Sequence, residues 1–275
     1  MLGKLLKHEF RATGRTLLPV IGAVLALCVL ANISIRILNV TDSTFVTILF
    51  GLIVSFFVLS IFVAAVMTTV VMVMRFYRNL LRDEGYLMHT LPVSVHELVW
   101  SKLIASFVWF LVTGLVIWLV ILLTVLIQTG TDLGEFFAGF PSWAEIREAM
   151  ARAGIRSGDI WAIGLEVLAA GILGGLTACL HFYAAMSMGH MFAKDKILLS
   201  VVFFVAISFL FSILNTGYGS LVAVGGITDG DFETFTQGIR VVQSFVLRIL
   251  GLQAIQAAVL YAATVLSLKK GLNLA

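Results

Sequence analysis

Six long apolar stretches, separated by shorter polar segments, dominate the chain. They cover residues 17–40, 46–74, 103–128, 161–188, 197–224 and 241–267. Each exceeds the ~20 residues with which a helix crosses the ~30 Å hydrocarbon core of a bilayer while satisfying its own backbone hydrogen bonds. The sequence lacks the alternation that is typical of a membrane β-barrel. The pattern therefore predicts an all-α, polytopic membrane protein with six transmembrane helices.

The composition agrees with a membrane location. Of the 275 residues, 60% are hydrophobic and only 12% are charged, whereas soluble domains hold roughly 45–50% apolar and about 25% charged residues. Cys28 and Cys179 lie inside apolar stretches, which indicates neither a disulfide framework nor a metal cluster. The sequence shows no internal repeat, low-complexity tract or compositional boundary. We therefore expect residues 17–275 to form one transmembrane domain.

Residues 1–16 have the pattern of an amphipathic helix. Its apolar residues lie near one side and its cations elsewhere, Leu2, Leu5, Leu6 and Phe10 against Lys4, Lys7, Arg11 and Arg15. Such a helix lies in the headgroup plane, with its cations near anionic phosphates. A simple cytoplasmic extension of the first span is the alternative. Because the following apolar stretch lacks a small-residue cleavage site, we expect a membrane helix and not a removed signal peptide.

The distribution of cations predicts the orientation, because cytoplasmic segments carry an excess of Lys and Arg. With a cytoplasmic N-terminus, the inner segments hold twelve of the eighteen cations, namely Lys4, Lys7, Arg11, Arg15, Arg75, Arg78, Arg82, Lys102, Lys194, Lys196, Lys269 and Lys270. The outer segments hold Arg36, Arg147, Arg152, Arg156, Arg240 and Arg248. Both termini are therefore predicted to be cytoplasmic.

The outer loop 129–160 has its own helix signals. Ser142 and Glu145 have capping-box spacing, and Glu148 with Arg152 forms a favourable i,i+4 pair. These signals predict a short amphipathic helix that rests on the outer membrane surface or caps a pathway. A plain surface connector explains them equally well.

Residues 75–102, between the second and third stretches, carry the strongest functional signal. Three cations at i, i+3 and i+7 are predicted to share one helix face where the second span emerges, namely Arg75, Arg78 and Arg82. Pro92 disfavours a helix at the residue before it, and Ser94 with Glu97 has the capping-box spacing that begins the next helix. The segment is predicted to be a short exposed turn between two spans.

The apolar residues of this turn are expected to be shielded from water. Exposure of Tyr86, Leu87 and Met88 to water is unfavourable unless a partner protein or the membrane covers them. We therefore interpret the turn as a surface that another protein binds. The alternative is that the arginines are only positive-inside anchors and the apolar residues enter the headgroups.

Motifs for chemistry are missing from the sequence. It contains no G-x-x-x-x-G-K-[ST] phosphate loop, no H-E-x-x-H and no G-x-S-x-G, and no span holds a close pair of carboxylates. We therefore expect that the chain is not an enzyme by itself and binds no cofactor of its own.

Two stretches of the sequence resemble the ABC-2 type permease subunits of bacterial ATP-driven exporters. They are RFYRNLLRDEGYLMHTLPVS, from Arg75 to Ser94, and KHEFRATGR, from Lys7 to Arg15. The resemblance implies a bacterial plasma-membrane protein with an amphipathic N-terminal helix, six spans, and a cytoplasmic coupling helix between helices 2 and 3. It implies that Glu84 to Leu91 dock into a separate ATPase that binds ATP and Mg²⁺, and that a second permease copy or a related permease completes the transporter.

The expected ATPase-docking residues are Arg75, Arg78, Arg82, Glu84, Gly85, Tyr86, Leu87, Met88, His89, Thr90 and Leu91. The shorter inner loop 189–196 is expected to be a minor second contact.

Three ionisable residues inside the spans are candidates for a pathway. Glu166 and Arg248 lie at similar depth in the fourth and sixth spans, and a lone charge near the bilayer centre costs ~2.5–3.5 kcal/mol on insertion scales. We expect them to pair or to line an outward-facing cavity; snorkelling to the outer interface is the alternative. His181 is deeper, and a hydrogen-bonded interior histidine is the simpler reading. Gly171 and Gly175 have GxxxG spacing, which allows close helix packing within or between protomers.

The leading hypothesis is a permease subunit of an ABC exporter for amphipathic peptides, toxins, lipids or drugs. One alternative is an ion-coupled carrier or channel without an ATPase, for which the intramembrane charges are thin support. Another is a non-transporting immunity or scaffold subunit that uses the same ATPase contact.

Overall fold

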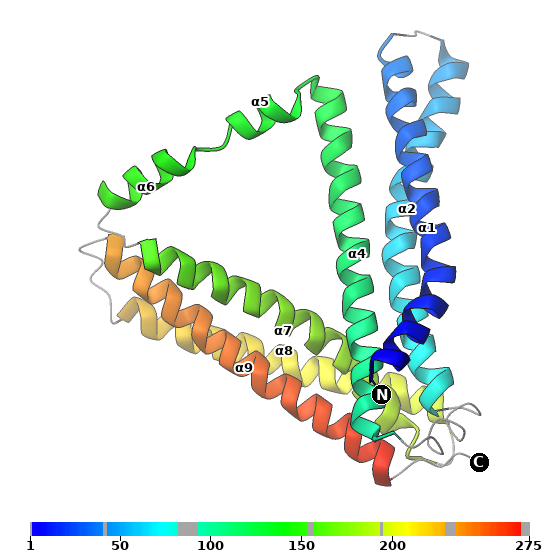
Figure 1. The fold of residues 1–275 in the computed structure, drawn as a ribbon, viewed down its shortest axis with the longest axis vertical. Coiled ribbons are helices and arrows are strands. Elements are labelled where there is room, and N and C mark those ends of the chain that lie inside the picture. The colour runs from blue at the N-terminus through cyan, green and yellow to red at the C-terminus, as the bar shows by residue number, and fades with distance from the viewer. Residues whose placement is uncertain are drawn as a thin grey trace. The chain divides into compact units, whose positions relative to one another are not determined.

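The computed structural model describes residues 2–40, 43–81, 93–152, 157–192, 195–228 and 235–270, which fold into helices and contain no strand. The elements are α1 (Leu2–Leu38), α2 (Thr44–Phe76), the short π-helix η1 (Tyr77–Leu81), α4 (Val95–Thr129), α5 (Leu133–Ala138), α6 (Trp143–Arg152), α7 (Ser157–Gly189), α8 (Lys196–Thr228) and α9 (Phe235–Lys270) (Figure 1). The predicted all-α class is confirmed.

Six helices of the described chain are long and apolar enough to cross a membrane. They are Leu2–Leu38, Thr44–Leu81, Val95–Thr129, Trp161–Gly189, Lys196–Leu221 and Gln243–Lys269. Each overlaps one predicted span, so the prediction of six helices that are long and apolar enough to cross a membrane is confirmed. The 37 residues of α1 rise about 55 Å, so this helix continues well beyond the ~30 Å hydrocarbon core.

The chain divides into two compact units. Unit 1 contains Met1–Phe76 and Trp100–Phe140, and unit 2 contains Tyr77–Val99 and Pro141–Ala275. The chain therefore passes from unit 1 to unit 2 where α2 continues into η1, and it returns within α4. No change in composition marks these boundaries, and the expectation of one transmembrane domain stays a prediction.

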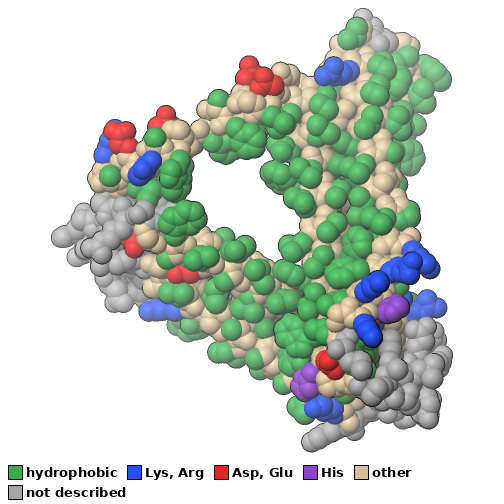
Figure 2. Space-filling model, viewed as in Figure 1, with side chains coloured by type: hydrophobic (Ala, Val, Ile, Leu, Met, Phe, Trp, Pro, Cys, Tyr) green, Lys and Arg blue, Asp and Glu red, His purple; other side chains and the backbone are tan. Residues whose placement is uncertain are grey.

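The buried core of unit 1 is apolar and lies between α1, α2 and α4. One cluster of buried residues in it consists of Val24, Cys28, Ala31, Phe57, Ala64 and Val120. On the face in Figure 2, hydrophobic side chains cover the length of these helices, and the Lys and Arg side chains gather toward the helix ends. Large apolar residues such as Phe56 and Phe62 are exposed on α2, which is the surface that lipid would cover.

Polar side chains inside unit 1 are paired across helices. The hydroxyl groups of Thr68 and Thr113 lie 2.9 Å apart. The amide nitrogen of Asn32 donates to the hydroxyl of Thr124 at 3.2 Å, and its oxygen accepts from Gln128 at 3.1 Å. Hydrogen bonds of this kind hold helices together in a membrane, because an unpaired polar group there has no water molecule with which to form a hydrogen bond.

In unit 2, α7 packs against α8 and α9. The ends of α7 and α8 approach closely at Gly189, where a Cβ atom would lie only 2.5 Å from the backbone nitrogen of Ser200 and 2.6 Å from its Cα. Glycine is therefore the residue that permits the two helix ends to meet. Tyr183 and Ala184, which precede Gly189 in α7, are almost completely buried.

The local helix signals of the sequence are present in the structure. Ser142 and Glu145 form the expected reciprocal capping box, with bonds of 2.8 and 3.2 Å, at the start of α6. Arg152 bonds Glu148 at 2.7 Å. The sequence reading missed the short α5, which begins with the carboxylate of Asp132 accepting from the backbone N–H of Glu135 at 2.7 Å.

Residues 2–16 are the first turns of α1 and continue without interruption into the first span. Their cations Lys4, Lys7, Arg11 and Arg15 are exposed, whereas Leu2, Leu5, Leu6 and Phe10 are half-buried. The two-sided pattern is therefore present, but the structure does not show a separate interfacial helix. The continuity with α1 is the arrangement of the alternative, an extension of the first span.

Candidate functional site

The predicted coupling turn is described only at its two ends. Arg82 and Glu84 to Leu91 lie outside the described residues, so their predicted docking role stays a prediction. Residues 75–81 precede this gap and residues 93–102 follow it. Ser94 and Glu97 form the predicted capping box, with bonds of 3.2 and 3.3 Å, so α4 begins where the sequence indicates.

The arginines before the gap have different surroundings. Arg75 is partly buried and its guanidinium lies 3.5 Å from the carboxylate of Glu9, whereas Arg78 is exposed. The α-helical register ends at Phe76, because Tyr77–Leu81 form a π-helix. The i, i+3, i+7 spacing assumes an unbroken α-helix, so the predicted common face is not supported at Arg75 and Arg78. Short π-helical turns are often found at functional sites.

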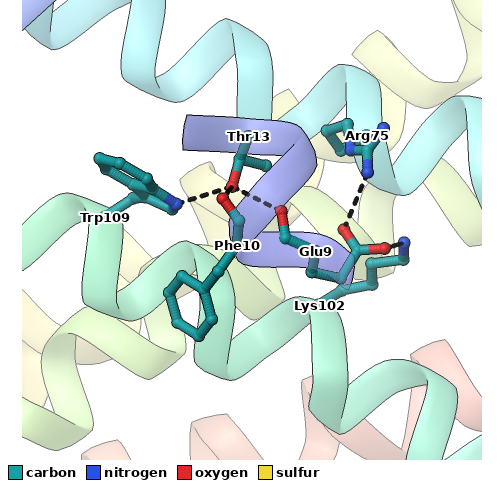
Figure 3. A network of polar contacts seen from close by, with 6 residues as sticks. All are labelled: Glu9, Phe10, Thr13, Arg75, Lys102 and Trp109. Atoms are coloured by element: carbon teal, nitrogen blue, oxygen red, sulfur yellow. Dashed lines mark hydrogen bonds and ion pairs between the residues drawn. The ribbon is translucent and has the colours of Figure 1, made fainter. Parts of the chain in front are cut away.

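A buried charge cluster fixes the start of α1 to α2 and α4 within unit 1 (Figure 3). Glu9, which is 6% exposed, forms ion pairs with Arg75 and with Lys102, which is 3% exposed. One turn further along, the indole nitrogen of Trp109 donates to the hydroxyl of Thr13 at 2.7 Å. These contacts involve both helices that lead into and out of the coupling turn. The sequence reading assigned no role to Glu9 or Trp109.

In unit 2, the segment before the gap contacts the end of α7. The rings of Tyr77 and His190 meet edge to face, with centroids 5.2 Å apart. His190 is 3% exposed, and its Nδ1 bonds the backbone oxygen of Met186 at 2.9 Å. Burial lowers the pKa of His190 below its ordinary value; the bond to Met186 opposes this, and the positive charge of Lys196 adds to it.

The shifted pKa of His190 predicts acid sensitivity. A histidine whose pKa is lowered by folding stabilises the fold fully above its unfolded pKa of ~6.5, and this contribution is lost as the pH falls through that value toward the folded pKa. The thermal midpoint of the purified protein should therefore fall between pH 7.5 and 5.5, and His190→Gln should reduce that fall. His8→Gln, at an exposed histidine of α1, is the matched control for the loss of an imidazole. Equal behaviour of both variants would contradict the prediction.

The segment after the gap contacts the end of α9. His96 lies 2.7 Å from the hydroxyl of Tyr261 through Nδ1, and Nε2 lies 3.3 Å from the ammonium of Lys269. Because an ammonium group only donates, Nε2 must accept, and Nδ1 then carries the proton that is donated to Tyr261. The described residues on either side of the predicted coupling turn therefore contact other side chains of unit 2, Tyr77 at α7 and His96 at α9.

The two predicted intramembrane charges have separate surroundings. Oε1 of Glu166 accepts a hydrogen bond of 3.0 Å from Gln243 of α9, while Oε2 is buried without a partner among the described residues. Arg248 is exposed. No ion pair joins Glu166 to Arg248 in the described chain, and an amide takes the place that the sequence reading gave to the arginine. A role for either residue in a pathway stays a prediction.

His181 lines a partly open cavity between α7, α8 and α9 of unit 2. Its Nε2 is 3.0 Å from the hydroxyl of Ser208 and 3.3 Å from the backbone oxygen of Phe204. The cavity has a volume of about 580 Å³. It is lined by Gly174, Thr177, Ala178, His181, Ser208, Phe211, Ser212, Asn215, Tyr218, Ile249, Leu252, Gln253 and Gln256. His181 is thus hydrogen-bonded, as the simpler reading expects, and it also faces a space.

The sequence reading missed most of the cavity residues. The signal that identifies them is the spacing of uncharged polar residues within apolar stretches, with Ser208, Ser212 and Asn215 at i, i+4 and i+7, and Gln253 and Gln256 at i and i+3. Such spacing places them on one face of each helix. Gly171 and Gly174 meet no neighbouring atom that a Cβ would touch, so the structure shows no tight packing within the chain at these two glycines.

Comparison with models of known protein families, with curated proteins and with solved structures finds no match.

Proposed function

We propose that the chain is the permease subunit of an ABC exporter in a bacterial plasma membrane, with both termini in the cytoplasm. It forms the translocation pathway with a second permease and is driven by separate ATPase subunits that bind ATP and Mg²⁺. The two stretches that resemble ABC-2 permeases support this proposal, as does the presence of six membrane-crossing helices.

The attachment of the coupling turn is the observation that carries the proposal. Tyr77, which precedes residues 82–92, contacts His190 at the end of α7. His96, which follows them, contacts Tyr261 of α9. A turn that is fixed at both ends to membrane-crossing helices can transmit a push or pull from a docked protein, whereas a loosely attached turn would absorb it. Within unit 1, the buried Glu9 cluster joins α2 and α4, the helices before and after the predicted turn, to the start of α1.

In the proposed mechanism, the energy enters as movement. Closing of the two ATPases around nucleotide displaces the docked turn, and the contacts of Tyr77 and His96 pass this displacement to α7 and α9. The chain itself performs no hydrolysis. Its work is to convert a displacement at the cytoplasmic end into a rearrangement of the helices that surround the pathway.

Charged substitutions in the turn test the docking role. The double variant Tyr86→Asp, Leu87→Asp should abolish co-purification of the ATPase from mild detergent, because two carboxylates oppose burial of this apolar surface in a protein groove. Membrane insertion should be unchanged. Phe136→Asp, Phe137→Asp in the predicted outer loop is a matched control and should leave the ATPase bound. Retention of the ATPase by the Tyr86 and Leu87 variant would contradict the docking role.

An ion-coupled carrier is the second candidate, and Glu166 is the observation that favours it. A carboxylate inside a span with one oxygen buried and without a hydrogen-bond partner among the described residues is suited to bind a proton or cation. Glu166→Gln should abolish gradient-driven transport in vesicles in that case. Transport that requires ATP and the ATPase decides for the exporter, and ATPase stimulation without transport indicates the immunity or scaffold subunit.

A further inference from the structure

Polar stripes on α7, α8 and α9 face one cavity in unit 2. Thr177 and His181 belong to α7, Ser208, Ser212, Asn215 and Tyr218 to α8, and Gln253 and Gln256 to α9. All lie within the segments that cross the membrane. None of the described lining residues is Asp, Glu, Lys or Arg. The described membrane-crossing part of unit 2 therefore borders a partly open, largely apolar cavity, and the polar groups among its described lining residues include no acidic side chain and no Lys or Arg.

These polar groups differ from those of unit 1 in what they bond. In unit 1, Asn32 and Gln128 satisfy each other and their neighbours across closely packed helices. In unit 2, Gln256 donates to Asn215 at 2.9 Å, but the side-chain oxygen of Gln253 is buried and has no hydrogen-bond partner among the described residues. A buried carbonyl without a donor is unfavourable, because nothing compensates the loss of its hydrogen bond to water. A ligand that brings a donor would remove this penalty.

The lining indicates the chemistry of the ligand. Carboxamides donate and accept at once, as peptide groups do, and Asn215, Gln253 and Gln256 supply three of them. Phe211, Ile249 and Leu252 supply apolar walls. Among the described lining residues there is no Lys or Arg to pair a phosphate or carboxylate, and no Asp or Glu to pair an ammonium group. The volume of about 580 Å³ lies within the ~300–1,000 Å³ of pockets that hold small ligands.

From these observations we infer that the cavity between α7, α8 and α9 binds an uncharged peptide segment with apolar side chains. Its use as a cargo site rests on the proposed function, whereas the binding is a property of this chain and requires no ATPase. The main-chain amide groups of the segment hydrogen-bond the carboxamides of α8 and α9, and its side chains pack on the apolar walls. Termini or charged side chains of the peptide stay outside.

The test uses the full chain in detergent and a photoreactive diazirine derivative of the blocked dipeptide acetyl-leucyl-leucinamide. Crosslinks mapped by mass spectrometry should fall in residues 174–181, 208–218 and 249–256 and should be saturable. Unlabelled acetyl-leucyl-leucinamide should compete at least about tenfold better than zwitterionic leucyl-leucine, because burying an unpaired charge costs several kcal/mol.

Two different substitutions test the site, so that the test does not depend on a single variant that could fail to fold. Gln253→Leu keeps the size of the side chain and should weaken labelling about threefold to tenfold, which corresponds to the loss of one or two hydrogen bonds. Ser212→Leu places bulk at an exposed position of the lining and should block labelling by volume. Gln128→Leu in unit 1 is the matched control and should label as the unaltered chain does.

Three results would each overturn the inference. They are labelling that does not saturate, equal labelling of the Gln253→Leu and Gln128→Leu variants, and displacement of the probe by the uncharged lipid monoolein but not by the blocked dipeptide. Loss of the ATPase from purified complexes would count against the proposed function and leave this experiment unaffected, so the two proposals fail separately.

Discussion

Glu9→Leu is expected to destabilise the protein by about 3–5 kcal/mol, the typical effect of removing one partner of a buried ion pair. Lys102, which is 3% exposed, would lose its ion pair with the Glu9 carboxylate, and Arg75 would lose the same partner. The midpoint of thermal unfolding in detergent, followed by tryptophan fluorescence, should fall by roughly 10 °C. Trp109 reports on this region directly, because its indole bonds Thr13.

A second substitution distinguishes lost charge pairing from lost packing. The double variant Glu9→Leu, Lys102→Met should recover much of the stability, because an apolar pair of similar size often replaces a buried ion pair without loss. The exposed pair of α6 is the control, since Glu148 and Arg152 are 66% and 75% exposed and Glu148→Gln should change the midpoint little. If Glu9→Leu were as stable as this control, the Glu9 carboxylate would not stabilise the fold by pairing with Lys102 and Arg75, which would contradict the prediction.

Gly189→Ala is expected to destabilise unit 2 by about 1–3 kcal/mol, the usual effect of overpacking. The added Cβ would overlap the hydroxyl oxygen of Ser200 and lie 2.5 Å from its backbone nitrogen. A side chain alone could rotate away, but the backbone of α8 must move. Thermal unfolding measured in the same detergent should show a midpoint several degrees lower.

Gly171 of the same helix provides the matched control. A Cβ at Gly171 would meet nothing within 4 Å, and alanine is the better helix former by about 1 kcal/mol. Gly171→Ala should therefore leave stability unchanged or raise it slightly. Equal midpoints for both variants would show that α7 and α8 separate near Ser200 without loss, which would contradict the close approach.

The spans and helix starts could be predicted because their signals are local. An apolar stretch of more than twenty residues needs no knowledge of its partners to be identified as membrane-crossing. The capping boxes of Ser94 with Glu97 and of Ser142 with Glu145 depend on residues three positions apart. Each of these predictions concerns a neighbourhood of the chain and not a contact between distant segments.

The contacts that shape the candidate site could not be predicted, because they join distant positions. Glu9 and Lys102 are 93 residues apart, and each is an ordinary charge when its own surroundings are read. Arg78 is exposed, whereas Arg75 is partly buried, and between them the α-helix changes to a π-helix. The types of side chain in this segment do not reveal that change. Glu166 bonds Gln243 and not the predicted Arg248. The rotation of α7 and α9 about their axes determines which side chains face each other, and residue spacing within one helix does not give that rotation.

The exchange of chain segments between the two units has a consequence for dividing the protein. A break between Phe140 and Pro141 would leave residues 77–99, which belong to unit 2, attached to the N-terminal polypeptide. The C-terminal polypeptide would then lack Tyr77 and His96, the residues that contact its His190 and Tyr261. The two fragments would therefore complement each other by insertion of an arm and would not behave as independent halves.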